Sequence, residues 1–394
     1  MQSQNSIIYS TDIGSDPDDA MSLNTALNLG LNIRTVYTVN GDVGSRSYIA
    51  RHQLNLAGKR KTPVLIGESQ SLAQRIEPYT YFEKDFIDDS FIDEEASCGE
   101  KDIYYKSFQN VGIIKNGTES LAKILSKSKH TIFSIAPLTG IALLVQDYPE
   151  AAKNIERLYI MGGRFSDSSI PEHNFRYDPD AAHVVLNSDI PITIIPSDLC
   201  NQFRMPMQML KQLQSPSGQY VKHMCYAYLA IKTASRFAMT NIPILSTNLV
   251  SALKDQVKAT PETLKEIGGK ETLELSDKKD GLLTNLNDLV HASFKGEKYL
   301  EQYLELIRTI KIPRYFSYGE ELAKIMINLI PGDLAVADVY VPYCFANRDK
   351  LKTARANMDC DIEGRSIVTL GDKHEIVMDL DFEDFKRFLQ QFLR

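Results

Sequence analysis

Residues 6–31 are SIIYSTDIGSDPDDAMSLNTALNLGL, and this stretch decides the fold. Its first six residues form a short run rich in β-forming side chains, which predicts a strand. Residues 20–31 then carry apolar side chains at helical spacing and end near Gly30. Residues 34–39 (RTVYTV) predict a second strand, which Asn40-Gly41 breaks. A strand, a helix and a strand in this order predict a parallel sheet with helices on its faces.

The same alternation continues along the chain. Further helices are predicted at residues 47–57, 121–126, 138–145 and 180–186, and further strands at 63–66, 131–135, 157–161 and 192–195. Helical patterns dominate from about residue 203 to 330. The predicted fold is α/β: an open, mostly parallel, Rossmann-like sheet flanked by helices, with a helical C-terminal insertion region. Because no long Pro/Gly/Ser linker is present, we expect one domain over residues 1–394, with insertions near 73–118 and 240–311.

Composition narrows the functional class. The 394 residues include 44 Lys+Arg and 51 Asp+Glu, a net charge of −7, so nucleic acid and anionic membranes are not expected partners. No apolar run approaches the ~18–20 residues of a membrane span. The first ten residues lack the pattern of a signal peptide. Five scattered cysteines without a CxxC pair favour a reduced, cytoplasmic location over a disulfide or zinc framework.

An acidic loop follows the first predicted strand. Four carboxylates fall within eight residues: Asp12, Asp16, Asp18 and Asp19. This is the carboxyl edge of the sheet, where open α/β folds bind ligands. Crowded carboxylates repel one another unless a cation neutralises them. The loop therefore predicts a divalent metal site, and Ca²⁺ tolerates irregular oxygen geometry better than Mg²⁺ does.

Three other interpretations of this loop compete with a metal site. Aspartates at a helix N-terminus can serve as caps, which would explain one or two of the four. An EF-hand fits poorly, because the glycine comes too early and no glutamate closes the loop. A phosphatase of the haloacid dehalogenase type would need an aspartate two residues before Asp12, where this chain has Ser10.

The segment TDIGSDPDDAMSL resembles the N-terminal signature of the inosine–uridine preferring nucleoside hydrolases, D-x-D-x-G-x-D-D-x-x-A-L, with Ser10 at the first aspartate and two extra residues. Five further segments resemble the family in order: residues 38–43 (TVNGDV), 134–142 (SIAPLTGIA), 160–163 (IMGG), 172–182 (EHNFRYDPDAA) and 331–337 (PGDLAVA). The resemblance covers roughly residues 7–394 and is weak at 73–118 and 203–330.

The resemblance implies a bound Ca²⁺ and a set of site residues. By position, the metal ligands would be Asp12, Asp19, Asp333 and the carbonyl of Ile135. Asp12 would also take the proton from the metal-bound water that attacks the anomeric carbon. Asp18 would bind a ribose hydroxyl, with Asp16 as a rival because of the two-residue expansion. The remaining sugar contacts would come from Glu172, Asn174 and Asp42, although Asp42 stands where the family has Asn and accepts without donating.

Activation of the leaving base departs from the family pattern. Gly332 stands where many members have a histidine general acid, so His173 is the candidate replacement and His223 a second one. Tyr226 and Tyr228 lie in a helical stretch where relatives contact the base. The chain has no Trp, so any stacking must come from Tyr or Phe. A lone histidine is more often structural than catalytic, and tyrosines at helical spacing more often pack in the core.

The predicted function is Ca²⁺-dependent hydrolysis of the N-glycosidic bond of a ribonucleoside, giving free base and ribose, as in purine or pyrimidine salvage. The partner would be a small-molecule ribonucleoside, and the family resemblance implies a homo-oligomer, a dimer or tetramer. Gly332 and Asp42 favour an alternative: a Ca²⁺-binding pseudoenzyme that recognises a ribosyl ligand without cleaving it. A metal-dependent phosphatase is a third possibility.

Overall fold

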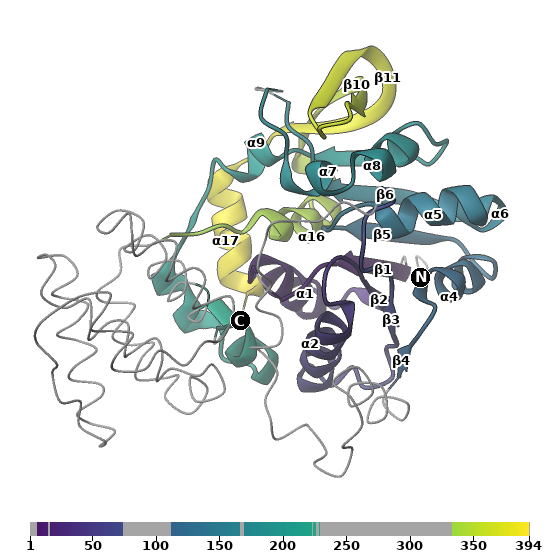
Figure 1. Cartoon of the computed structure of the whole chain (residues 1–394). Helices are drawn as coiled ribbons and strands as arrows, with labels where there is room; N and C mark the ends of the chain where they lie inside the picture. The colour runs from purple at the N-terminus through teal and green to yellow at the C-terminus, as the bar shows by residue number, and fades with distance from the viewer. Residues whose placement is uncertain are drawn as a thin grey trace, which may run out of the picture. The chain divides into compact units, whose positions relative to one another are not determined.

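The computed structural model describes residues 6–14, 16–73, 112–165, 169–222, 224–225, 228 and 333–393 (Figure 1). The chain divides into two compact units. The first comprises Met1–Val221 and Leu334–Arg394, and the second comprises Lys222–Asp333. The prediction of a single domain with two insertions stays a prediction.

The described residues of the first unit build one nine-stranded sheet in the order β10-β11-β7-β6-β5-β1-β2-β3-β4. Its strands are β1 (Ser6–Thr11), β2 (Asn32–Thr38), β3 (Val64–Ile66), β4 (Ile113–Ile114), β5 (His130–Ser134), β6 (Ile155–Met161), β7 (Ile192–Ile195), β10 (Lys352–Cys360) and β11 (Ser366–Asp379). Neighbouring strands are parallel except β10 and β11, which are antiparallel. The predicted α/β fold is confirmed. Two short strands, β8 (Met205–Pro206) and β9 (Asp333–Leu334), pair apart from this sheet.

The strand order reverses direction at β1. The chain runs outward through β2, β3 and β4 on one side of β1, and through β5, β6 and β7 on the other. β1 pairs in parallel with both β2 and β5. Open α/β sheets bind ligands at the carboxyl ends of strands beside such a reversal. The fold therefore places Asp12, which follows β1, and Ile135, which follows β5, at the expected ligand crevice.

Helices cover both faces of the sheet (Figure 1). One face carries α4 (Gly117–Leu125), α5 (Thr139–Asp147) and α8 (Pro179–Leu186), and the other carries α1 (Asp18–Asn28), α2 (Val43–Leu56), α16 (Tyr340–Ala346) and α17 (Phe382–Phe392). Shorter helices are α6 (Pro149–Ala152), α7 (His173–Tyr177) and α9 (Ser197–Cys200), and the 3-10 turns are η3 (Met207–Gln212), η5 (Ala337–Val339) and η6 (Arg348–Lys350). None of the described helices is long and apolar enough to cross a membrane.

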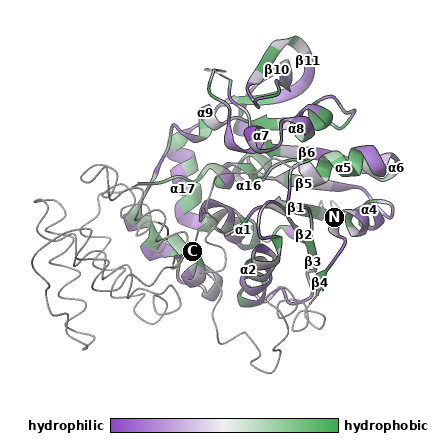
Figure 2. Cartoon of the chain, viewed as in Figure 1, coloured by the Kyte–Doolittle hydropathy of each residue, from purple (hydrophilic) through white to green (hydrophobic). Residues whose placement is uncertain are grey.

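Successive side chains of the strands point to opposite faces of the sheet and pack into the core on each face. Ile8 of β1 packs in the cluster that includes residues of α4, α5 and α8. Its neighbour Tyr9 points to the opposite face, where its hydroxyl bonds to Ser22 of α1 and its ring meets Phe133 edge-on. Successive side chains of a strand point to opposite faces, so the two buried residues serve two cores. Figure 2 colours β3 as hydrophobic, as expected for a strand whose side chains are mostly buried, whereas Ile114 of the edge strand β4 is 40% exposed.

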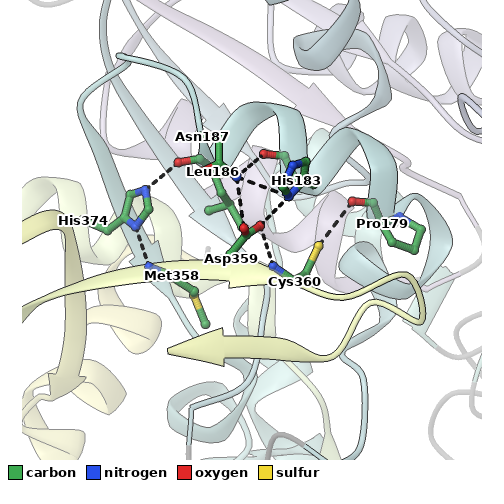
Figure 3. A network of polar contacts seen from close by, with 8 residues as sticks. All are labelled: Pro179, His183, Leu186, Asn187, Met358, Asp359, Cys360 and His374. Carbon is green, nitrogen blue, oxygen red and sulfur yellow. Dashed lines mark hydrogen bonds and ion pairs between the residues drawn. The ribbon is translucent and has the colours of Figure 1, made fainter. Parts of the chain in front are cut away.

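The antiparallel β10–β11 hairpin is fastened to α8 by buried polar contacts (Figure 3). The Nδ1 atom of His374 accepts the amide hydrogen of Met358 at 2.9 Å, and Nε2 lies 3.0 Å from the carbonyl oxygen of Leu186. Burial lowers the pKa of His374, which suits a neutral ring that accepts at one nitrogen and donates at the other. At the surface, Asp359 of β10 lies 2.8 Å from Nδ1 of His183.

Candidate active site

The carboxyl end of β1 presents Asp12. This carboxylate is half-buried, and its Oδ2 atom accepts a hydrogen bond from Nδ2 of Asn40 at 3.2 Å. Asn40 follows β2 in a turn with a left-handed φ of 70°, and Gly41 has a φ of 64°. Asn and Gly are the residues that tolerate this conformation best. The turn therefore directs an amide donor from β2 onto the carboxylate that follows β1.

Three buried carboxylates gather beside this strand end. Asp18 and Asp19 begin α1, and Asp338 lies on η5, more than 300 residues later in the chain. One carboxylate oxygen from each lies within 4.8 Å of the other two. All three side chains are at most 7% exposed. The hydroxyl of Thr11 donates to Oδ1 of Asp19 at 2.5 Å, which fixes that carboxylate against the end of β1.

The surroundings of these three acids oppose their ionisation. Burial, followed by the charges of neighbouring aspartates, raises the pKa of Asp18 and of Asp338 well above the ordinary value. Burial and the charge of Asp12 likewise raise the pKa of Asp19, and Thr11 and Arg46 partly offset this. Buried like charges can all ionise only when a positive charge joins them.

The donor chemistry fits a hard divalent cation. Carboxylate oxygens are the ligands that Ca²⁺ and Mg²⁺ prefer. Within the part of the chain that the structure describes, Asp18, Asp19 and Asp338 are the set of acids close enough to share an ion. Asp12 lies outside this set, but its charge acts on all three members. Asp16, half-buried in the same loop, also raises the pKa of each of them.

Glu172 and Asn174, at the start of α7, contact the backbone at the carboxyl ends of β5 and β6. Glu172 caps α7 and accepts hydrogen bonds from the backbone amides of Gly163, Asn174 and Phe175 at 3.0–3.1 Å. Nδ2 of Asn174 lies 3.1 Å from the carbonyl oxygen of Met161 and 3.4 Å from that of Ile135. Burial raises the pKa of Glu172, although these amides favour its ionised form. The structure thus brings three predicted site residues, Glu172, Asn174 and Ile135, into one hydrogen-bonded group.

The other predicted residues lie in varied settings. Asp42 caps α2, and its carboxylate accepts from the backbone amide and the hydroxyl of Ser45 at 3.1 and 2.9 Å. His173, the first residue of α7, is exposed, and its charge favours ionised Glu172. Asp333 is exposed and Tyr228 is half-buried, and both belong to the second unit. Tyr226, His223 and Gly332 lie outside the described residues.

Three residues of this site escaped the sequence analysis: Asp338, Asn40 and Arg46. Asp338 directly follows the PGDLAVA segment, and it is an acid inside the apolar run AVADVYVPY. An acid in such a run is informative, because buried carboxylates need partners. From its sequence context, Asn40 only indicates the break after the second strand. Arg46 gives no signal beyond its place in α2, and only the fold shows that it is buried near the acids.

Comparison with known proteins agrees with this geometry. The family model of the inosine-uridine preferring nucleoside hydrolases matches residues 7–387. A non-specific ribonucleoside hydrolase, RihC, from Salmonella paratyphi B is 41% identical over 86 residues. That match covers 21% of this chain and only 28% of the relative.

Solved structures share the fold at low sequence identity. A purine-preferring ribonucleoside hydrolase from Gardnerella vaginalis superposes with a TM-score of 0.56 at 16% identity, covering 98% of both chains. An inosine-uridine preferring nucleoside hydrolase from Bacillus anthracis gives the same TM-score and identity, covering 99% of both chains. These likenesses show that the nine-stranded sheet is the fold of the family.

Proposed function

Since this chain belongs to the inosine-uridine preferring nucleoside hydrolase family, a family of N-glycosyl hydrolases, we propose that it hydrolyses the N-glycosidic bond of a ribonucleoside to give free base and ribose. The observation that carries the proposal is the group of buried carboxylates, Asp18, Asp19 and Asp338, beside Asp12 at the reversal of the sheet. Such a group suits a cation-assisted attack on a sugar.

Asp12 is the proposed general base. It is half-buried, unlike the three acids beside it, and the amide of Asn40 restrains one of its oxygens. Asp12 would take a proton from water as the water oxygen bonds to the anomeric carbon and the bond to the base nitrogen breaks. The transition state would have oxocarbenium character, as in glycoside hydrolysis generally.

The proposed cation is Ca²⁺. Asp18, Asp19 and Asp338 are the residues whose placement supports a binding role, and the family resemblance adds Asp12, the Ile135 carbonyl and Asp333. Asp18 thereby has two proposed roles, as a cation ligand and as a contact to a ribose hydroxyl, with Asp16 as the alternative contact. When bound, the cation would supply orientation of the ribose hydroxyls and acidification of water.

The remaining sugar contacts are assigned to Glu172 and Asn174. Glu172 is held by three backbone amides, and Asn174 bridges the ends of β5 and β6, so both are pre-positioned on rigid elements. His173 is the proposed donor of the proton that the leaving base needs, because it is exposed beside Glu172 at the start of α7. The tyrosines at 226 and 228 remain the proposed contacts to the base.

The test is incubation with a panel of common and modified ribonucleosides, followed by separation of free base from nucleoside. We expect base release in the presence of Ca²⁺. Asp12→Asn should lower kcat by about 10²–10⁴-fold, the usual contribution of a general base, with an unchanged Tm. Asp180→Asn, at an exposed aspartate of α8, is the matched control and should keep full activity.

The panel also separates the rival functions. Ligand binding without base release from any member would indicate the non-cleaving ribosyl-binding protein, an alternative that neither the family match nor the relatives support. Release of phosphate without release of base would indicate a phosphatase. A cytoplasmic location, a role in salvage and a dimeric or tetrameric state are further proposals that rest on the family resemblance.

A further inference from the structure

A completely buried arginine lies beside the proposed active site. Arg46, on the first turns of α2, is 1% exposed. Its Nε–H group donates to the carbonyl oxygen of Asn40 at 2.6 Å. Burying a guanidinium is costly unless it makes strong polar contacts, so a fully buried arginine needs a physical reason. The contact with Asn40 supplies part of that reason.

Asn40 connects Arg46 to the proposed base. Its left-handed backbone is held on both sides, because its amide donates to the carbonyl oxygen of Glu68 at 2.7 Å and its own carbonyl accepts from Arg46. Its side-chain amide then donates to Oδ2 of Asp12 at 3.2 Å. A non-glycine residue in this conformation costs roughly 1–2 kcal/mol, so contacts that hold it there are needed. Arg46, Asn40 and Asp12 thus form a continuous hydrogen-bonded chain.

The charge of Arg46 also reaches the buried acids. It lowers the pKa of Asp19 against the opposing effects of burial and of Asp12. The guanidinium is therefore close enough to act on the same cluster that would hold a cation. Its hydrogen bond to Asn40 and its charge therefore both act on residues at the carboxyl end of β1.

We propose that Arg46 is a positioning residue for the reaction: it fixes the turn of Asn40, whose amide in turn orients Asp12 for proton transfer. The inference rests on the proposed function. It adds a residue of α2 that acts on Asp12 through Asn40. A general base must be held within about 0.5 Å of its productive position for fast proton transfer. Loss of the contacts that hold Asp12 should therefore lower kcat and leave KM nearly unchanged.

The chain offers a matched control on the same helix. Arg51 is also buried, at 2% exposed, and its guanidinium donates to the carbonyl oxygens of Lys59 and Thr62 and to Oδ1 of Asn55. All of these partners lie in α2 and the turn that follows it. Arg46→Met and Arg51→Met therefore remove similar buried cations, but only the first removes a contact to the site.

The first experiment measures kcat, KM and Tm for both variants and for Asn40→Gly on the nucleoside that the wild-type protein cleaves fastest. Glycine accepts the left-handed turn, so Asn40→Gly removes the donor to Asp12 without straining the backbone. We expect Arg46→Met and Asn40→Gly to lower kcat by about 10–100-fold with KM changed less than about threefold. The double variant should lose little more than either single variant, since both act on one chain of contacts. Arg51→Met should lower Tm but keep kcat within about twofold.

The second experiment titrates Ca²⁺ alone against the same proteins by calorimetry. Arg46→Lys is added here because it keeps the positive charge beside the acids but loses the Nε–H donor to Asn40. We expect Arg46→Lys and Asn40→Gly to weaken Ca²⁺ binding by about 10-fold, and Arg51→Met to leave it unchanged. Wild-type Ca²⁺ affinity in both Arg46→Lys and Asn40→Gly would overturn the proposal, because it would show that the contacts through Asn40 do not hold Asp12 in place. A kcat for Arg46→Met equal to that of Arg51→Met would overturn it as well.

The two experiments separate the inference from the function. If the wild-type chain binds Ca²⁺ but cleaves no nucleoside, the proposed function fails while the Ca²⁺ titration still decides the role of Arg46 in orienting Asp12. A wild-type chain that neither binds Ca²⁺ nor releases a base overturns both.

Discussion

Aspartates a few residues apart in one loop receive different surroundings. Asp18 and Asp19 are buried and joined by Asp338, so their pKa values are raised and they suit a cation. Asp12 is only half-buried and has a neutral amide donor on one oxygen. A base must reach water and exchange a proton, whereas a ligand must be fixed and dry. The different roles proposed for these acids therefore rest on their burial and on their hydrogen-bond partners.

The role of Asp338 can be tested against that of Asp333. Asp338→Asn removes a charge from a buried group of three, so we expect it to weaken Ca²⁺ binding at least about 10-fold. Calorimetry of Asp338→Asn, Asp333→Asn and the exposed control Asp349→Asn measures this directly. Wild-type affinity in Asp338→Asn would remove it from the cation site. A loss in Asp333→Asn would add the ligand that the family resemblance implies.

At the scale of elements, the start of α2 carries two separate roles. Asp42 satisfies the free amide at the N-terminus of the helix through Ser45, while Asn40, two residues earlier, turns toward Asp12. A helix cap is worth about 1 kcal/mol, and a helix N-terminus favours an adjacent carboxylate. The cap explains Asp42 without any contact to the sugar.

Two substitutions of Asp42 distinguish capping from substrate binding. Asp42→Ala should lower the free energy of unfolding by about 1 kcal/mol in denaturant, whereas Asp42→Asn should keep most of it, because asparagine also caps helices. If Asp42 only caps, both variants keep the wild-type KM. A KM raised several-fold in Asp42→Asn, with unchanged stability, would instead show that the carboxylate touches the sugar.

Elements were predictable from local pattern, and contacts between distant segments were not. β1 and β7 begin and end at the predicted residues, because a short buried strand is marked by its β-forming side chains. The first helical turns were missed: α2 starts at Val43, four residues earlier than the apolar pattern indicates, because its cap and not its hydrophobicity sets the start. Asp338 joins Asp18 only through tertiary structure, so no local pattern could place it there.

At the scale of the whole molecule, the reversal of the sheet at β1 explains how the site is assembled. Residues that follow β1, β2, β5 and β6 all emerge at one edge because these strands are parallel neighbours. Asp12, Asn40, Ile135 and Glu172 therefore meet although they span 160 residues of sequence. Asp338 arrives from η5, which packs against α1. The first unit thus contains the group of three buried carboxylates on which the proposed cation site rests.

The buried acids of this site lower the stability of the fold when they are ionised, so the free energy of unfolding should depend on pH. An acid whose pKa is raised on folding binds its proton more tightly in the folded chain than in the unfolded one. Without a cation, Asp18, Asp19 and Asp338 therefore destabilise the fold when ionised at neutral pH, and lowering the pH below their raised pKa values relieves that cost. A cation must displace the same protons, so it should stabilise the fold most at high pH and least at low pH.

Thermal unfolding with Ca²⁺ or with a chelator, at about pH 8 and about pH 5.5, tests this reasoning. At about 100 times its Kd, Ca²⁺ adds about 2.7 kcal/mol to the free energy of unfolding, so Tm should be several degrees higher with Ca²⁺ than with chelator at the higher pH. That difference should shrink at the lower pH, where protons compete for the carboxylates. Asp338→Asn should remove about half of the difference or more at the higher pH, as a 10-fold or larger loss of affinity implies, and Asp349→Asn should preserve it. A Ca²⁺-dependent rise in Tm that is the same at both pH values would contradict binding by buried acids whose pKa values are raised.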